Sequence, residues 1–175
     1  MFRDGPLTRK APETIRYGTG RCALGALLVA SSARGIVSIM VRDSASRLIR
    51  DLAARFPKAS LVRDDKGSKA TVAKVARYIA APLRPFALPL DIRGTDLQKR
   101  VWREVGKIPF GETSTYSRIA EAIGAPKAIR AVAGSCSRSS LAFAVPCHRV
   151  LHTGRRREGR QYDWVDYEAK LARIS

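Results

Sequence analysis

Hydrophobic positions in the first half of the chain change from a strand-like to a helix-like pattern. Two apolar runs that favour β-strands, RCALGALLVA and GIVSIMVR, flank the turn-like SSARG and predict a hairpin over roughly 21–42. Apolar residues then recur at helical spacing in 44–56, where Ser44 can cap the first turn, and again in 68–80. This order predicts a small antiparallel sheet with helices packed on it.

Proline and glycine mark the limits of that first part. The first 13 residues are rich in Pro, Gly and charge, which is typical of a loose tail. The segment APLRPFALPLDIRG carries three prolines and predicts an extended connection, with a domain boundary near 82–93. We therefore predict a tail over 1–13, an N-terminal α/β domain over 14–85 and a second domain over 86–175.

The second part shows clearer helix signals. Thr95 and Gln98 form a capping-box pattern ahead of an amphipathic segment. Thr115 can cap a short helix that Gly124 ends, and Pro126 suits the first position of another helix. Two short helices joined by a tight turn containing glycine predict a helix-turn-helix.

The second of these helices has two distinct faces. Its apolar face is predicted to bury Ile129, Val132, Ala133 and Cys136. Its other face carries small residues beside one arginine: Ala128, Ala131, Gly134, Ser135 and Arg130. Small side chains let a helix backbone approach a nucleic-acid groove, where an arginine can enter the base stack or pair with phosphate. Small side chains serve close helix–helix packing equally well, so both interpretations stay open.

The net charge of the chain indicates which class of partner it binds. The 175 residues hold 33 Lys and Arg against 15 Asp and Glu, a formal net charge of +18. Such an excess predicts attraction to a polyanion, either nucleic acid or an anionic membrane surface, although a merely solvated surface is the alternative. The run GRRREGR, 154–160, is either a solvated loop or an additional phosphate contact.

Cysteine usage and hydropathy indicate a soluble protein of a reducing cytoplasm. The three cysteines are odd in number and form no CxxC pair, so a disulfide framework is not expected. Cys22 stands alone without a zinc-ligand pattern and is predicted to be a core residue. No apolar run approaches 18 residues, and the N-terminus has no apolar signal core, so we expect no membrane association.

The stretch VPCHRV carries the candidate chemistry. Cys147 can be a core residue on a strand, a metal ligand with His148 and His152, or a nucleophile whose proton a neighbouring imidazole takes. A zinc site usually needs four ligands from paired spacings, and no second Cys/His pair is present, so no metal is expected. Spacing alone does not decide between the core and nucleophile interpretations.

A resemblance to a known family, carried by longer stretches of the sequence, favours the nucleophile interpretation of Cys147. PCHRV resembles the active-site motif of the O6-alkylguanine-DNA alkyltransferases, and VWREVGKIPFGETSTYSRIAEAIGAPKAIRAVAGSC resembles their helix-turn-helix region. Residues 14–63 are similar to the N-terminal half of bacterial members, especially the C-terminal part of the adaptive-response alkyltransferases. The likeness covers roughly residues 14 to 154. It implies a ribonuclease-H-like N-terminal part and a winged-helix-like C-terminal part.

The resemblance also implies a reaction. The protein would bind double-stranded DNA containing O6-alkylguanine, flip the base out, and transfer the alkyl group irreversibly to Cys147, once per molecule and without a cofactor. His148 would deprotonate the thiol through a water, and Tyr116 would donate a hydrogen bond to the flipped guanine. The implied location is the bacterial cytoplasm, at the nucleoid, and the implied state is a monomer.

The remaining site residues follow from the same likeness. Arg130 would fill the space that the flipped base leaves. The minor-groove face would consist of Ala128, Ala131, Gly134 and Ser135. The backbone carbonyls of Cys147 and Val150 would read the guanine amino group.

Three departures from the family pattern affect the predicted site. Ser139 stands where the family usually has an Asn that orients the loop beneath the active site. The lid, 158–167, has two additional residues, and Val165 replaces a glycine. The family's last helix carries a Glu that bonds the histidine, but here Ile174 or Ser175 takes that place and Glu168 lies about two turns earlier. We therefore expect His148 to lack its carboxylate and the transfer rate to be reduced.

Two other classes of function remain to be distinguished. A lesion-binding protein without transfer activity would share the fold, and the altered lid and the missing Glu favour it. Cys147 argues against it. A helix-turn-helix transcription factor is the other alternative, and it would bind a specific site without a lesion.

Overall fold

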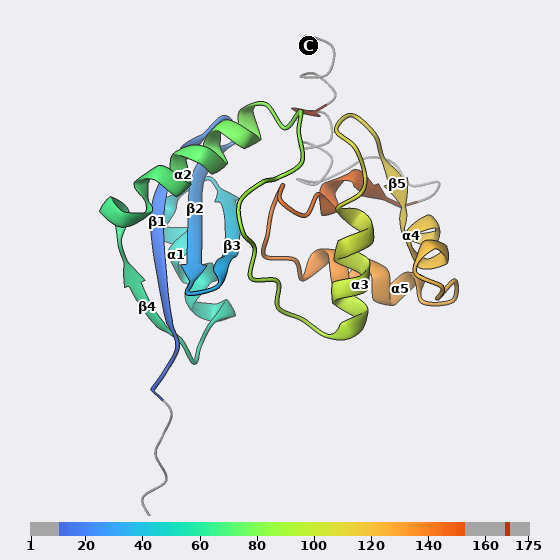
Figure 1. Cartoon of the computed structure of the whole chain (residues 1–175), viewed down its shortest axis with the longest axis horizontal. Helices are drawn as coiled ribbons and strands as arrows, with labels where there is room; N and C mark the ends of the chain where they lie inside the picture. The colour runs from blue at the N-terminus through green and yellow to red at the C-terminus, as the bar shows by residue number, and fades with distance from the viewer. Residues whose placement is uncertain (1–10, 153–166, 169–175) are drawn as a thin grey trace, which may run out of the picture.

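A four-stranded sheet, on the left of Figure 1, forms the N-terminal half of the computed structural model, which describes residues 11–152 and 167–168. Its strands are β1 (Thr14–Cys22), β2 (Gly25–Ser32), β3 (Gly35–Arg42) and β4 (Ser60–Arg63), in the order β3-β2-β1-β4. Neighbours β1–β2 and β2–β3 are antiparallel, whereas β4 is parallel to β1. The predicted hairpin is confirmed in β2 and β3, but the sequence did not predict β1 or β4.

One helix packs on each face of this sheet (Figure 1). Helix α1 (Ala45–Arg55) lies against β2 and β3, and α2 (Asp65–Ala80) lies against β1 and β2. Successive residues of β2 point alternately to the two sides, so Leu28 packs with α1 while Leu27 packs with α2. Burial on both faces explains why β2 and β3 read as continuous apolar runs. The predicted Ser44 cap lies at the start of α1 but makes no side-chain capping bond.

The C-terminal half is helical. It contains α3 (Asp96–Val105), α4 (Tyr116–Ala122) and α5 (Ile129–Ser137), a 3-10 turn η1 (Cys147–Arg149), and the paired short strands β5 (Ser114–Thr115) and β6 (Val150–Leu151). The predicted capping box is confirmed: the Thr95 hydroxyl accepts from the Gln98 backbone N–H, and the Gln98 side chain accepts from that of Thr95. The mixed α+β class is therefore confirmed.

The helix-turn-helix is confirmed in α4 and α5, but its turn is longer than predicted. Thr115 caps α4 through the Arg118 backbone N–H, and Gly124 follows the helix with φ of 71°. Pro126 lies in the turn and not at the first helical position, because α5 begins only at Ile129. That shift leaves Ile129 43% exposed, so its predicted burial is wrong.

The two halves share one hydrophobic core. Leu27 and Ile39 of the sheet belong to the same cluster as Val101, Trp102 and Phe143 of the helical half. The proline-containing segment between α2 and α3 runs along β3 and pairs with it at Leu90, in a single parallel bridge to Ile36. The edge of β3 is thereby covered, which removes a site for unwanted strand pairing.

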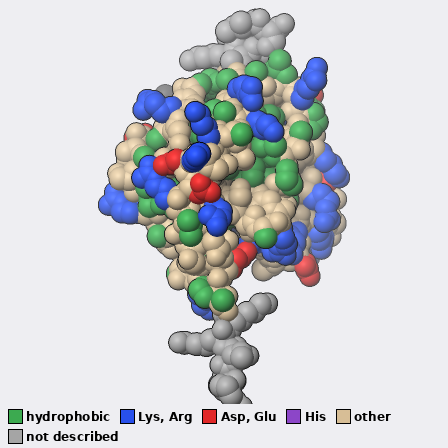
Figure 2. Space-filling view, turned by 60° about the vertical axis from the view of Figure 1, so that its left-hand side comes forward, with side chains coloured by type: hydrophobic (Ala, Val, Ile, Leu, Met, Phe, Trp, Pro, Cys, Tyr) green, Lys and Arg blue, Asp and Glu red, His purple; other side chains and the backbone are tan. Residues whose placement is uncertain are grey.

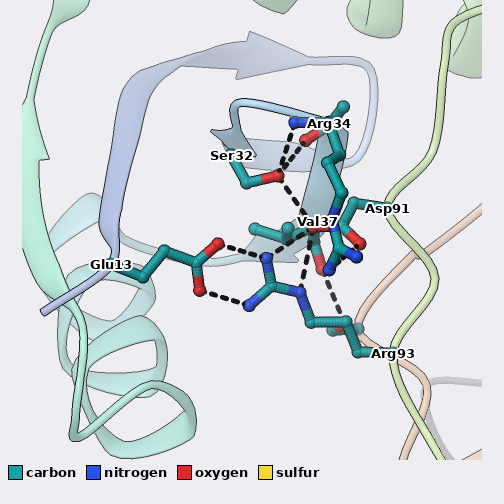
Figure 3. A network of polar contacts seen from close by, with 8 residues as sticks. Glu13, Ser32, Arg34, Val37, Asp91 and Arg93 are labelled. Atoms are coloured by element: carbon teal, nitrogen blue, oxygen red, sulfur yellow. Dashed lines mark hydrogen bonds and ion pairs between the residues drawn. The ribbon is translucent and has the colours of Figure 1, made fainter. Parts of the chain in front are cut away.

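A polar network fixes that segment to the sheet (Figure 3). The buried carboxylate of Asp91 accepts hydrogen bonds from Ser32 and Arg93 and forms an ion pair with Arg34, 2.9 Å away. Arg93 also makes a two-pronged contact to the Glu13 carboxylate. Glu13 is thus anchored, although the sequence predicted that it belongs to a loose tail.

Candidate active site

The segment before Cys147 is held against the edge of β3. The Ile39 backbone N–H donates to the Ser140 carbonyl at 2.7 Å, and Ala142 donates to the Ile39 carbonyl at 3.1 Å. Two hydroxyls add to this attachment, because Ser140 donates to the Val37 carbonyl and Ser38 donates to that of Ser140. The N-terminal sheet therefore positions the loop on which the cysteine depends.

Cys147 lies at the start of a 3-10 turn and not on a strand. The Cys147 N–H donates to the Val145 carbonyl at 2.7 Å, and the Arg149 N–H donates to that of Pro146 at 2.9 Å. On a strand, neighbouring side chains would point to opposite faces, and the tight turn removes that constraint. The Cys147 side chain lines a cavity of about 210 Å³, and His148 lines the same cavity.

Cys136, predicted only as a core residue, is a direct neighbour of the Cys147 thiol. Both cysteines line the cavity, and a hydrogen bond from one thiol to the other, together with burial, raises the pKa of Cys147 well above its ordinary value. A hydrogen bond from Ser139 acts in the opposite direction and favours the thiolate. At neutral pH the thiol is therefore protonated, and a base must take its proton before it can act as a nucleophile.

Glu168 supplies the carboxylate that the sequence comparison placed out of reach. Its Oε1 lies 2.8 Å from His148 Nε2, and both residues are buried. The expectation that His148 lacks a carboxylate partner is therefore wrong. Glu168 reaches the imidazole because its neighbour, Tyr167, is held against α2. The Tyr167 hydroxyl donates to the Ile79 carbonyl at the end of α2, and the adjacent glutamate then meets the imidazole.

Arg149 holds Glu168 from the other side. Its Nε donates to Oε2 at 2.7 Å and a terminal nitrogen donates to Oε1 at 2.8 Å, while the other terminal nitrogen donates to the Ile108 carbonyl. Arg149 was not predicted as a site residue, although a charged residue inside an apolar run indicates a buried partner. The paired guanidinium compensates the charge of the carboxylate in this buried position.

These contacts define the state of the imidazole. Burial favours the uncharged form of His148 and lowers its pKa, although Glu168 acts in the opposite direction. Burial raises the pKa of Glu168, but the hydrogen bonds from His148 and Arg149 outweigh it and keep the carboxyl ionised. An ionised carboxylate only accepts, so Nε2 carries the proton of the neutral imidazole. Nδ1 is then the basic nitrogen.

Phe143 fixes the imidazole ring from another side. Its ring centroid lies 4.7 Å from that of His148, and Phe143 is fully buried. Its backbone has φ of 63°, in the left-handed region that bulky residues rarely adopt. Backbone in this region costs about 1–3 kcal/mol and persists where the surroundings enforce it. Here the pairing of the same loop with β3 provides that constraint.

A two-strand pairing brings Tyr116 to the acceptor segment. Strands β5 and β6 are parallel, with Ser114 opposite Val150 and Thr115 opposite Leu151. Tyr116 follows β5 directly and is buried, with its ring 4.7 Å from that of His152. Two predicted residues that lie far apart in the sequence, Tyr116 and Val150, are thus placed at one short sheet.

The predicted groove-facing side of α5 is only partly exposed. Arg130 and Ala131 are exposed, and Ala128 and Gly134 are half-buried. Ser135 is buried, with its hydroxyl donating to the Ala131 carbonyl, so its predicted place on the open face is wrong. Its carbonyl also accepts from the Trp102 indole N–H at 2.9 Å, because α5 turns this side toward α3.

Several other predictions concern parts that the structure describes only partly. The lid prediction for 158–167 and the arginines of 154–160 lie outside the described residues, except for Tyr167. Among residues 11–152 and 167–168, no group of three or more His, Cys, Asp or Glu side chains could hold a metal ion. Over the same residues, no helix is long and apolar enough to cross a membrane.

The helix-turn-helix is a common motif of DNA-binding proteins, and a cysteine beside a histidine that a carboxylate orients is a common pattern of nucleophilic sites. Residues 15–92 match the family model of the ribonuclease-like domain of 6-O-methylguanine DNA methyltransferase, and residues 96–173 match that of its DNA-binding domain. A probable methylated-DNA–protein-cysteine methyltransferase of Acanthamoeba polyphaga mimivirus is 40% identical over 118 residues, 67% of this chain and 75% of that protein. The chain belongs to the O6-methylguanine-DNA methyltransferase family, as its sequence predicted.

Solved structures and longer relatives agree with this assignment. Mycobacterium tuberculosis OGT in complex with DNA is 31% identical, with a TM-score of 0.71 over 89% of this chain and 93% of that one. The Escherichia coli bifunctional transcriptional activator/DNA repair enzyme Ada is 42% identical over 160 residues. That match covers 91% of this chain but 45% of Ada, so the chain spans less than half the length of this relative.

Proposed function

We propose that this chain reverses O6-alkylguanine damage in double-stranded DNA by transferring the alkyl group to its own Cys147. The thiolate attacks the alkyl carbon, an S–C bond forms, and the bond from that carbon to guanine O6 breaks. The electron pair stays on the guanine, which takes up a proton. A thioether is stable to thiol exchange, so each molecule acts once. A protein with this substrate works at the chromosome, which places it at the nucleoid.

Proton removal from Cys147 is the step for which the site is built. The raised pKa of the thiol leaves little thiolate at neutral pH. His148, neutral and with Nδ1 as its basic nitrogen, takes the proton through an intervening water. Glu168 bonds Nε2 of the same ring and stabilises the imidazolium that forms. This buried carboxylate–imidazole pair beside a cavity-lining thiol is the observation that carries the proposal.

Recognition is assigned to the helical half. A guanine inside a duplex is out of reach of a thiol that lines a cavity, so the base must be flipped out. Arg130, exposed on α5, fills the vacated space, and the exposed Ala131 with the half-buried Ala128 and Gly134 lets the helix approach the minor groove. Tyr116 donates a hydrogen bond to the flipped guanine, and the carbonyls of Cys147 and Val150 accept from its amino group. Ser135 and Ser139 support these segments from inside.

Figure 2 shows Lys and Arg side chains spread widely over one face of the molecule, with few acidic ones among them. A net charge of +18 gives sequence-independent attraction to phosphates, and it does not require a single basic stripe. The net charge and the helix α5 therefore have different roles in the proposal: the charge attracts the protein to DNA, and α5 positions it on the groove.

The test is a stoichiometric transfer assay on a duplex with one O6-methylguanine. We expect the duplex to regain guanine while the protein gains one methyl mass, up to one per molecule, and Cys147→Ser to do neither. Lesion-specific binding without any transfer would instead indicate a damage sensor. The presence of Glu168 removes one of the two reasons for expecting that outcome, and it removes the main reason for expecting a slow reaction.

A further inference from the structure

The cavity beside Cys147 is closed on one side by the N-terminal half. Besides the acceptor loop, its lining includes Arg42 at the end of β3 and Arg55 at the end of α1. The same two arginines, with Asp51, also line an adjoining surface hollow. The space around the reacting sulfur is therefore bounded by cationic side chains that the helical half does not supply.

These charges are not fully balanced. Arg42 Nε lies 3.0 Å from Asp51 Oδ2, so one guanidinium has a carboxylate partner. Arg55 donates to the Arg138 carbonyl at 2.8 Å, and it has no ion pair among the residues that the structure describes. Among the described residues that line the cavity and the adjoining hollow, two guanidinium groups against one carboxylate leave one positive charge in excess.

A charge in this position matters for what the thiol can accept. A neutral alkyl group, such as methyl, gains nothing from a cation beyond the carbon that is attacked. A carboxyalkyl group brings a carboxylate close to the attacking thiolate, and the two negative charges repel each other. A guanidinium at the wall of the same cavity offsets that repulsion and can bond the carboxylate directly.

We propose that Arg55, with Arg42, makes the acceptor site selective for anionic carboxyalkyl groups on guanine O6, of which carboxymethyl is the smallest. This inference rests on the proposed transfer to Cys147. The Cys147 sulfur forms a bond to the methylene carbon, the bond from that carbon to O6 breaks, and guanine keeps the electron pair. The thiol proton ends on the guanine, and the product is S-carboxymethylcysteine.

The experiment compares two lesions of equal size. Duplexes carry either O6-carboxymethylguanine or its neutral amide, O6-carbamoylmethylguanine, and single-turnover transfer rates are measured for each. The ratio of the two rates separates charge from size and from any general change in DNA affinity. Arg55→Gln is expected to lower this ratio about fivefold, the effect of an interaction near 1 kcal/mol at a partly exposed site.

Further variants test the direction of the change in this rate ratio and provide a control. Asp51→Asn removes the compensating carboxylate and is expected to raise the ratio, while Arg55→Lys keeps the charge and much of the preference. Arg50→Gln removes the same charge from an exposed position of the same helix and should leave the ratio unchanged. Thermal melting shows whether each variant is folded.

An unchanged ratio in both Arg55→Gln and Asp51→Asn overturns the inference. A fall in the rates for both lesions to the same extent also overturns it, since it would assign Arg55 to phosphate contact. Transfer from O6-methylguanine, measured in parallel, tests the proposed function separately: if methyl is transferred and the ratio does not respond, only the carboxyalkyl selectivity fails.

Discussion

The exposed side of α5 and the surroundings of Cys147 are built in opposite ways. The α5 surface comes from one helix, whose buried residues Val132, Ser135 and Cys136 follow the helical repeat. The surroundings of the thiol come from β3, α1, α5, the loop before η1 and residues 167–168. The local sequence predicted the α5 helix but misplaced Ile129 and Ser135 on its faces, whereas a site assembled from five segments depends on how the whole chain packs. Binding and chemistry should therefore be separable by substitution.

The largest expected effect is the loss of the base. His148→Ala should lower the single-turnover transfer rate about 10²–10³-fold at pH 7, because the protonated thiol of Cys147 then has no positioned acceptor for its proton. Lesion binding, measured with the unreactive Cys147→Ser background, should remain within about threefold. A rate that falls only together with binding would contradict a separate chemical role.

Removal of the carboxylate should affect both stability and rate. Glu168→Gln leaves the buried Arg149 guanidinium without its charge partner, which typically costs about 3–5 kcal/mol. Urea unfolding measures this loss. The transfer rate, measured where the variant is still folded, should fall about tenfold or more because the imidazole loses its orienting partner. Glu104→Gln, a substitution at a surface ion pair, is the control and should change the stability by less than about 1 kcal/mol.

Acid should weaken the same site. The folded-state pKa values of both His148 and Glu168 lie below their ordinary values. For both groups the stabilisation is present above the unfolded pKa, about 6.5 for histidine and about 4.3 for glutamate, and is lost as the pH falls through the folded pKa. The free energy of unfolding should therefore decrease from pH 7 toward pH 4. Glu168→Gln should remove the part of the decrease that lies below about pH 4.3, where the glutamate itself takes up a proton on unfolding; an identical decrease there would contradict the assignment.

A substitution of Arg130 tests the role of the exposed side of α5. Arg130→Ala should slow transfer from duplex DNA about tenfold, because the extruded state loses the side chain that fills the stack, a contact worth about 1–2 kcal/mol. The free base O6-benzylguanine needs no flipping, so its rate should not change. Arg118→Ala, on the preceding helix, serves as the charge-matched control. Equal losses on duplex and free base would indicate that Arg130 has no role in extrusion.

The smallest expected effect is an increase in the transfer rate. Cys136→Ala removes the thiol whose hydrogen bond raises the pKa of Cys147, so that pKa should fall and the transfer rate near pH 7 should rise about twofold to fivefold. A rate profile against pH locates the change, which should appear as a shift of the thiol limb toward lower pH. A slower reaction with an unshifted profile would indicate that Cys136 acts only in packing.

Sequence patterns predicted the elements with local signals and missed those without them. The capping box at Thr95, the cap at Thr115 and the helix-turn-helix were correct because these caps and the apolar spacing are local signals. The parallel strand β4 was missed because its four residues gain their structure from pairing with β1. The division of the chain into 14–85 and 86–175 stays a prediction, and the shared hydrophobic core crosses it.

Site residues divide in the same way. Cys147, His148 and Tyr116 were predicted by motif, and the structure places them around the same loop and short sheet. Glu168 was rejected by counting helical turns, yet its contact with His148 is set by where the chain crosses the core, which counting cannot give. Cys136 and Arg149 were missed because their roles depend on one neighbour each, in the cavity and in the buried ion pair.

The most direct test of the account uses the two thiols that share one cavity. After reaction with a duplex carrying O6-methylguanine, peptide mapping by mass spectrometry can distinguish methylation of Cys147 from that of Cys136. We predict one methyl group, confined to the peptide with Cys147, because we assign the His148–Glu168 pair to the deprotonation of that thiol. Methylation of Cys136, or none on either cysteine while the lesion is still bound, would contradict it.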